Sequence, residues 1–457
     1  MFNILSFVNT LNTISSILLA ILVLLIMITV HELGHYIAGK IFKFKINEFA
    51  IGMGPAIFKR TNKATGEVFS IRALPLGGFC AFEGEDEESK TENAFNNKEP
   101  WKRVIVLVAG ATMNLIVGVL VLILSIGIYG QIAINTYDIR PTTAPEYAGY
   151  SLENGDNILK IENKAIFMAT DVVDAINGKK QGDIVSVVVD SDGETKTRKV
   201  RLRNDVSSDS LVDVISAFTA LGISTIDRVD GVTNDSQFKI GDYVLRLNDN
   251  ENYDDCTRLF SFNELITYAR TLNVGDTLGL YVIRGEDKES ISILIDSDFS
   301  LLTDEQVLNE LGVTQKSLLL KYTTNNVRFS FFESISRGVK YSVSVGGTIF
   351  KTLGGLLTGK LGVEAVGGPI TTITVTSNAI KQGGFNYFLE IMGFIGINLA
   401  LFNLLPIPAL DGSRVVFTVI EWIRKKPVNR KVEGIIHGVG LMLLLGFCIL
   451  VDILQLL

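Results

Sequence analysis

The sequence predicts a polytopic α-helical membrane protein with four spans and two β-containing regions between them. Four long apolar stretches indicate the spans. A polar middle predicts an insert outside the bilayer. The mixture of 47% hydrophobic and 20% charged residues, with a mean hydropathy of +0.34, agrees with apolar ends around a polar centre. The predicted segments are 1–41 (first span), 42–103 (β region), 104–129 (second span), 130–210 and 211–300 (two modules), 301–385 (juxtamembrane), 386–412 (third span), 413–431 (basic loop) and 432–457 (fourth span).

Composition excludes some classes of function. The net charge of −7 offers no basic surface, so we expect no nucleic-acid partner. Cys80, Cys256 and Cys448 lie in very different contexts, and they suggest neither a disulfide framework nor a thiolate zinc site. The first apolar segment lacks a basic start and a cleavage site, so we expect it to remain as a helix.

The first span ends in Thr29–His35, which contains two of the three histidines of the chain. Positions four apart share one face of a helix, so His31 and His35 point the same way with Glu32 beside them. Two such imidazoles can bind one Zn²⁺, and the carboxylate can serve a metal-bound water as general base. A chance motif on a solvated helix is the alternative. However, charged groups in a membrane helix cost about 2–3 kcal/mol each on insertion scales and usually mark function.

A catalytic zinc needs a third protein ligand. The third span ends in Asn403–Gly412, where two prolines free backbone groups and so indicate a chain that lines a cavity. Asp411 is the predicted ligand, because it and His31 both lie at the cytoplasmic ends of their spans. His437 is the competitor, although a lone histidine on a helix is more often packed against its neighbours.

Charge patterning predicts the topology. The first 39 residues carry no Lys or Arg, whereas 42–103 and 413–431 are basic, so these two segments are predicted to be cytoplasmic and both termini outside. The β-prone runs Phe49–Pro55 and Phe69–Phe79 predict hairpins that dip toward the bilayer, with a small cytoplasmic β-domain as the alternative. Charges within Arg328–Leu361 favour an amphipathic helix near the outer membrane surface.

The polar insert contains an internal repeat. A Gly-Asp turn followed by an alternating apolar strand occurs at Gly155–Asn163 and again at Gly241–Asp249, and each copy continues with a helical stretch and a hairpin. The pattern resembles tandem PDZ domains, at 130–210 and 211–300. In the second copy, Leu221–Ile223 resembles the carboxylate-binding loop that opens the peptide groove of these domains. The first copy has no equally clear loop.

Together these motifs resemble the site-2 protease family (peptidase family M50), in its bacterial RseP-type branch (regulator of sigma-E protease). The resemblance rests on H-E-L-G-H at His31–His35, N-x-x-P-x-P-x-L-D-G at Asn403–Gly412 and the PDZ-like insert between spans. It covers nearly the whole chain. Further matches are Leu76–Phe79, Phe95, Pro100, Arg103, Ala109–Gly110 and Asn114.

The resemblance implies an intramembrane zinc metalloendopeptidase. Its zinc ligands would be His31, His35 and Asp411. Glu32 would be the catalytic base, and Asn403 would hold substrate or stabilise the oxyanion. The residues implied in substrate binding are Gly52, Gly54, Gly77 and Gly78 of the re-entrant hairpins and Leu221, Gly222 and Ile223 of the PDZ-like loop.

The implied substrates are single-span membrane proteins, either trimmed anti-sigma factors or remnant signal peptides. An upstream site-1 protease would cut them first, and the PDZ domains would act as a size filter or docking site. The implied location is the bacterial inner membrane, and membrane lipid is an implied partner. The PDZ domains would be extracytoplasmic, and the active site would lie toward the cytoplasm. A membrane-tethered zinc peptidase acting on juxtamembrane peptides and a catalytically inactive PDZ scaffold are the alternatives.

Overall fold

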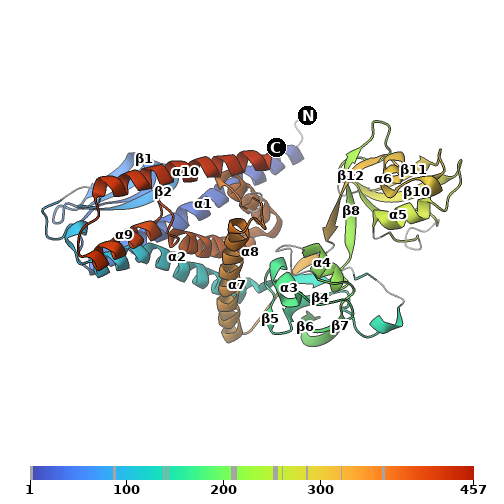
Figure 1. Ribbon diagram of the computed structural model, residues 1–457, viewed down its shortest axis with the longest axis horizontal. Coiled ribbons are helices and arrows are strands. Elements are labelled where there is room, and N and C mark those ends of the chain that lie inside the picture. Colours follow the sequence, from blue (N-terminus) through green and yellow to red (C-terminus); the bar gives the residue numbers. More distant parts are fainter. Residues whose placement is uncertain are drawn as a thin grey trace. The chain divides into compact units, whose positions relative to one another are not determined.

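The computed structural model divides into two compact units (Figure 1). The helical unit comprises Met1–Gln131 and Arg328–Leu457, and the sheet unit comprises Ile132–Val327. The structure describes residues 4–85, 89–136, 139–140, 144–206, 214–250, 256–259, 261–284, 287–320, 322–362 and 366–456.

The helical unit contains six α-helices and a two-stranded sheet in its described part. These elements are α1 (Ile4–Ile41), β1 (Ile46–Thr61), β2 (Val68–Phe82), α2 (Pro100–Tyr129), α7 (Phe331–Leu357), α8 (Pro369–Asn403), α9 (Asp411–Arg424) and α10 (Arg430–Leu456).

Within the described residues, four helices are long and apolar enough to cross a membrane. They contain Ile14–Ile41, Pro100–Tyr129, Gly383–Asn403 and Lys431–Leu454. The four predicted spans are therefore confirmed as helices. The N-terminal end of α1 and the C-terminal end of α10 lie at the same end of the unit (Figure 1). The third span is the second part of α8, which bends at Gly384, where φ is 65° and a glycine has no steric penalty.

Strands β1 and β2 are bent, so that they form more than a simple hairpin. Residues 48–51 pair on one side with 78–81 and on the other with 68–71, and 68–71 pair in turn with 58–61. Gly52, Gly54 and Gly77 have φ between 84° and 88°, a conformation that glycine adopts without strain, and they form the bends. Among the described residues, 78–81 is thus one edge of the sheet. Near the bends of the sheet, the side chain of Ile57 is 74% exposed and that of Leu74 is 54% exposed.

Helix α7 occupies the predicted juxtamembrane segment. Ser330 caps its start by accepting a hydrogen bond from the backbone N–H of Glu333. One face packs on α2, where Gly338 lies against the backbone of Ile123. Apolar side chains elsewhere on α7 are open, with Phe332 81% exposed and Leu357 89%. The helix runs across the direction of α1 and α2 (Figure 1). Its place at the outer membrane surface remains a prediction.

The sheet unit contains two sheets, which define two lobes. The first lobe has the strand order β13-β3-β4-β6-β7, with β5 paired to β4, and the second has β11-β10-β9-β8-β12. The elements of the first lobe are β3 (Gln131–Thr136), β4 (Asp156–Ile161), β5 (Lys164–Ala165), α3 (Ala169–Ile176), β6 (Ile184–Ser191), β7 (Glu194–Arg201), α4 (Val214–Ala220) and β13 (Thr323–Val327). Those of the second are β8 (Thr225–Val232), β9 (Tyr243–Leu247), α5 (Phe262–Ala269), β10 (Thr277–Arg284), β11 (Asp287–Leu294), α6 (Asp304–Glu310) and β12 (Val313–Leu320).

Both lobes use the Gly-Asp turn in the same way. The glycine of each turn, Gly155 or Gly241, has φ near 95° (94° and 96°). The following aspartate side chain is fully buried and pairs with an arginine, Asp156 with Arg198 at 3.1 Å and Asp242 with Arg284 at 2.7 Å. The repeated sequence therefore corresponds to a repeated buried ion pair.

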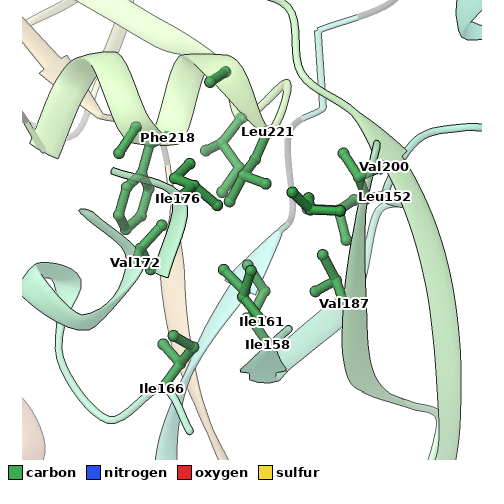
Figure 2. Packing of buried hydrophobic residues seen from close by; sticks show 14 of the residues in the cluster. Leu152, Ile158, Ile161, Ile166, Val172, Ile176, Val187, Val200, Phe218 and Leu221 are labelled. Carbon is green, nitrogen blue, oxygen red and sulfur yellow. The ribbon is translucent and has the colours of Figure 1, made fainter. Parts of the chain in front are cut away.

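Two predicted boundaries in this region, 210/211 and 300/301, differ from those of the lobes in the structure. Helix α4 lies after residue 210, yet Phe218 and Leu221 pack into the core of the first lobe (Figure 2). Strand β12 lies after residue 300 but pairs with β8 in the second lobe. Strand β13 then returns to the sheet of the first lobe. Because these pairings join distant parts of the chain, local sequence patterns do not reveal them.

Candidate metal and catalytic site

Helices α1 and α2 touch backbone to backbone at the site. A Cβ added to Gly34 of α1 would lie 2.8 Å from the Cα of Gly110 on α2. A Cβ added to Gly110 would overlap both imidazoles, with His35 Cε1 at 2.7 Å and His31 Cε1 at 2.8 Å. Glycine at both positions therefore lets α2 pass directly over the histidine face of α1.

The third group arrives from a distant part of the sequence. The chain leaves α8 after Asn403 and turns through the Pro406–Pro408 segment, and α9 then begins at Asp411. Gly412 allows this turn to close, because any Cβ there would overlap the carbonyl oxygens of Leu404 and Leu405. The carboxylate of Asp411 also lies at a helix N-terminus, where the helix dipole favours negative charge.

Three potential ligand atoms converge. Asp411 Oδ2 lies 2.9 Å from His31 Nε2 and 3.3 Å from His35 Nε2. The two Nε2 atoms are 3.1 Å apart. Both imidazoles are buried. No other cluster of three or more potential ligands was found among the described residues.

Hydrogen bonds outside this cluster orient the imidazoles. His35 Nδ1 donates to the carbonyl oxygen of Val106 at 2.8 Å. Because a carbonyl can only accept, the Nδ1 of His35 carries a proton, and its Nε2 in the neutral ring presents a lone pair to the cluster. The side-chain amide of Asn403 lies 3.4 Å from His31 Nδ1. Asn403 is thus placed beside the first histidine.

The cluster fits a zinc ion. In the described part of the chain, Asp411 Oδ2 is buried and no hydrogen-bond donor is directed at it, although the Nε2 atoms of His31 and His35 both lie against it, as the ligands of one ion would. A tetrahedral ion with bonds of roughly 2.1 Å separates its ligands by about 3.4 Å, and the three separations here are 2.9, 3.1 and 3.3 Å. Two imidazoles and one carboxylate are also a donor set used by catalytic zinc.

Glu32 lies beside the cluster and faces the edge of the β1–β2 sheet. Its Cγ is 3.5 Å from the position of a Cβ on Gly78, and its carboxylate lies near the backbone N–H of Cys80. The acid next to the histidines is therefore held between the three-residue cluster and a strand edge.

The other predicted site residues are distributed unevenly. Gly78 adjoins Glu32, whereas Gly52, Gly54 and Gly77 lie at the bends of the sheet. His437 is not in the cluster, because its Nδ1 accepts a hydrogen bond from the N–H of Ala409 at 3.1 Å.

The prediction of a carboxylate-binding loop at Leu221–Ile223 is wrong in this structure. The segment belongs to the first lobe, not to the second, and the side chains of Leu221 and Ile223 are at most 1% exposed. The backbone N–H groups of Leu221, Gly222 and Ile223 already donate to carbonyls of the preceding α4 helix, those of Ala217, Thr219 and Phe218. No backbone donor in this loop remains to bind a carboxylate.

Sequence reasoning missed the positioning groups. It did not identify the carbonyl of Val106 as the partner of His35, and it treated Gly110 only as part of a motif. A glycine in an apolar span near Ala109 was the one available signal. The backbone contact of Cys80 with Glu32 left no trace in the sequence, since any residue type can donate a main-chain N–H.

A family model described as Peptidase family M50 matches residues 19–447. A protein of Haemophilus influenzae named regulator of sigma E protease is 27% identical over 440 residues, which cover 93% of this chain and 94% of the relative. A Fusobacterium nucleatum protein and a Thermotoga maritima protein, both bearing the name of a zinc metalloprotease, are 27% and 26% identical. Their alignments cover 93% and 92% of this chain and 94% of each relative.

Proposed function

Because the chain belongs to peptidase family M50, whose members are zinc-dependent, we propose that it is an intramembrane zinc metalloendopeptidase. It hydrolyses peptide bonds within the transmembrane segments of other membrane proteins. The convergence of His31, His35 and Asp411 beside Glu32 carries this proposal, since three of these four groups, His31, Glu32 and His35, lie on a helix long and apolar enough to span a membrane.

Each polar group has a defined role in the proposed reaction. When bound by the two imidazoles and Asp411, Zn²⁺ acidifies a water molecule and polarises a carbonyl group. Glu32 takes up the proton of the attacking water and delivers it to the leaving amine. The amide of Asn403, next to His31, donates a hydrogen bond to the developing oxyanion.

The edge of the β1–β2 sheet is the proposed substrate site. Backbone groups of alternate residues in a strand point to the same side, so Gly78 presents its N–H and C=O on the side where Cys80 contacts Glu32. A helical substrate hides its carbonyls and must unwind before cleavage. The unwound segment adds as a strand to residues 78–81, which brings one peptide bond next to Glu32.

The same proposal also assigns roles to the β1–β2 sheet and to the sheet unit, and it names the substrates. The open apolar side chains at Ile57 and Leu74 support a β1–β2 sheet that dips into the bilayer. The two lobes of the sheet unit are PDZ domains outside the inner membrane, where they exclude or dock substrates according to size. The name of the Haemophilus influenzae relative supports anti-sigma factors as substrates, and we add remnant signal peptides, each after a site-1 cut.

Co-expression with tagged single-span membrane proteins tests this function. We expect the wild type to cut inside the apolar segment, and Glu32→Gln to leave it intact while still retaining zinc, because Glu32 is not one of the three ligands. Asp411→Asn should lose both zinc and cleavage. Fragment mass locates the scission bond, and elemental analysis of the purified protein measures zinc.

Other outcomes favour the alternatives. Fragments that end only in loops would support a membrane-tethered peptidase in place of the intramembrane enzyme. The experiment should also use substrates that are already trimmed to a short outer segment, because these do not need the prior cut. If the wild type and Glu32→Gln both leave such trimmed substrates intact, the catalytically inactive scaffold becomes the better interpretation.

A further inference from the structure

The remaining histidine of the chain, His437, contacts the backbone that carries Asp411. It lies on α10, the last helix. Its Nδ1 accepts a hydrogen bond from the N–H of Ala409 at 3.1 Å and lies 3.5 Å from Ser413 Oγ. Ala409 and Ser413 stand two residues before and two residues after Asp411. The imidazole therefore touches both sides of the segment that holds the carboxylate.

The turn before Asp411 needs an external support. Ala409 has φ of 80°, in the left-handed region that a residue with a Cβ rarely adopts. Two internal hydrogen bonds hold the turn, from Ile407 N–H to Leu405 O and from Leu410 N–H to Ile407 O. The N–H of Ala409 is bonded to His437, not to the turn itself. The bond from α10 thus fixes the residue whose conformation is least favourable.

Helix α10 approaches this turn closely on the same face. Gly440 follows His437 by three residues, so the two share a side of the helix. A Cβ on Gly440 would overlap Pro408 Cβ and lie 3.0 Å from the carbonyl carbon and oxygen of Pro408. Among the described residues, a Cβ on Gly438 meets nothing within 4 Å. In this glycine-rich part of α10, only the face that carries Gly440 therefore packs against the turn before Asp411.

The ring of His437 is itself held in place. An imidazole that accepts at Nδ1 carries its proton on Nε2 in the neutral form. That atom lies 4.0 Å from the carboxylate of Glu433, one turn earlier on α10. The ring of Phe417 on α9 packs edge-on, with centroids 5.7 Å apart and an interplanar angle of 60°. The packing of Phe417 leaves Nδ1 directed toward Ala409.

We infer that His437 is a positioning residue for Asp411, through which the last helix holds the third zinc ligand against the histidines of α1. This inference rests on the proposed role of Asp411 as a ligand. His437 acts as a hydrogen-bond acceptor at one atom, Nδ1. The side chain at position 437 must therefore offer a hydrogen-bond acceptor that lies as far from its own backbone as the Nδ1 of histidine does.

Asparagine and glutamine separate this requirement from simple packing. The Oδ1 of asparagine stands as many bonds from the backbone as Nδ1 of histidine, whereas the oxygen of glutamine stands one bond farther away. We expect full-length His437→Asn in detergent to retain zinc like the wild type. His437→Gln and His437→Leu should release zinc at chelator concentrations about 10–100-fold lower, the usual effect of losing an outer contact of a metal site.

A glycine pair provides a second test that leaves His437 unchanged. Gly440→Ala pushes α10 away from Pro408 and should weaken zinc retention, whereas Gly438→Ala on the open face should not. Thermal unfolding of the metal-free proteins identifies any variant that fails to fold. The inference is overturned if His437→Gln, His437→Leu and Gly440→Ala all retain zinc like the wild type while Asp411→Asn loses it. If Asp411→Asn itself retains zinc, the proposed ligand set fails, and the inference fails with it.

Discussion

Replacing Gly110 by alanine would place a methyl group against both imidazoles of the site. The added Cβ lies 2.7 Å from His35 Cε1 and 2.8 Å from His31 Cε1, whereas ordinary contacts begin near 3.4 Å. Each ring must therefore withdraw by at least roughly 0.6–0.7 Å, and the ring of His35 by more because its Nε2 lies closer still, which is well beyond the tolerance of about 0.2 Å in metal–ligand distances. The main chain of α2 cannot yield easily, because it also contacts Gly34 of α1.

The expected fall in zinc affinity can be distinguished from a general loss of folding stability. Alanine is favoured over glycine inside a helix by about 1 kcal/mol, so the helix itself should gain from the change. We expect zinc affinity to fall by at least the roughly 10–100-fold that follows loss of an outer contact of a metal site. Proteolysis should decrease with it, while the metal-free protein unfolds at an unchanged or higher temperature.

The matched control is Gly127→Ala in the same helix. Among the residues that the structure describes, a Cβ there approaches only Ser334 Cβ, at 4.0 Å. Chelator competition on both proteins in detergent, followed by elemental analysis, compares their zinc affinities. Equal affinity in the two variants would refute the assignment of the three-residue cluster as the zinc site.

Three further predictions concern stability. Arg103→Met should lower the free energy of unfolding by about 3–5 kcal/mol, because it leaves the buried Glu421 carboxylate, 2.6 Å from Arg103 in the wild type, without its cation. The partly buried neighbour Lys102, whose partner Glu99 is exposed, should cost less than about 1 kcal/mol when changed to Met, and similar melting temperatures for the two variants would contradict this prediction. Burial raises the pKa of Asp227 above its ordinary value of 3.8 although it accepts a hydrogen bond from the N–H of Phe262. The folded state then binds more protons than the unfolded state, so the stability of the sheet unit should fall as the pH rises above about 4, and Asp227→Asn should flatten this part of the melting profile. Removing zinc with a chelator should abolish proteolysis and lower the melting temperature, since a ligand at 100 times its Kd adds about 2.7 kcal/mol. Re-addition of zinc should restore both, and a melting temperature unaffected by the chelator would argue against a tight site.

Much of the helical unit could be predicted because the bilayer imposes simple rules. A span needs a long apolar run, and the four runs of this chain correspond to helices in the structure. The pairing of His31 with His35 follows from helix geometry alone. Asp411 could be selected because charge patterning places it and His31 at the cytoplasmic ends of their spans. The structure brings all three groups together, 380 residues apart in sequence at the widest.

The sheet unit was less predictable, because strand pairing depends on contacts between distant residues. The repeated Gly-Asp turns were visible in the sequence. The return of β13 to the first sheet and the packing of Leu221 in the first core were not. The predicted role of Leu221–Ile223 failed for the same reason, since the local pattern does not show that its N–H groups are already bonded.

The sequence by itself determined the chemistry of this protein, namely which side chains could bind zinc and which acid stands beside them. Residue identity and helical periodicity are local properties, so they can be read along the chain. Only the tertiary structure decided how those groups are held. They are held by features of the backbone, which cannot be predicted from the residue type. These features are the carbonyl of Val106, the N–H of Cys80 and the space above Gly110. His437 is the clearest case, because its residue type suggested a ligand and its position makes it a support for one.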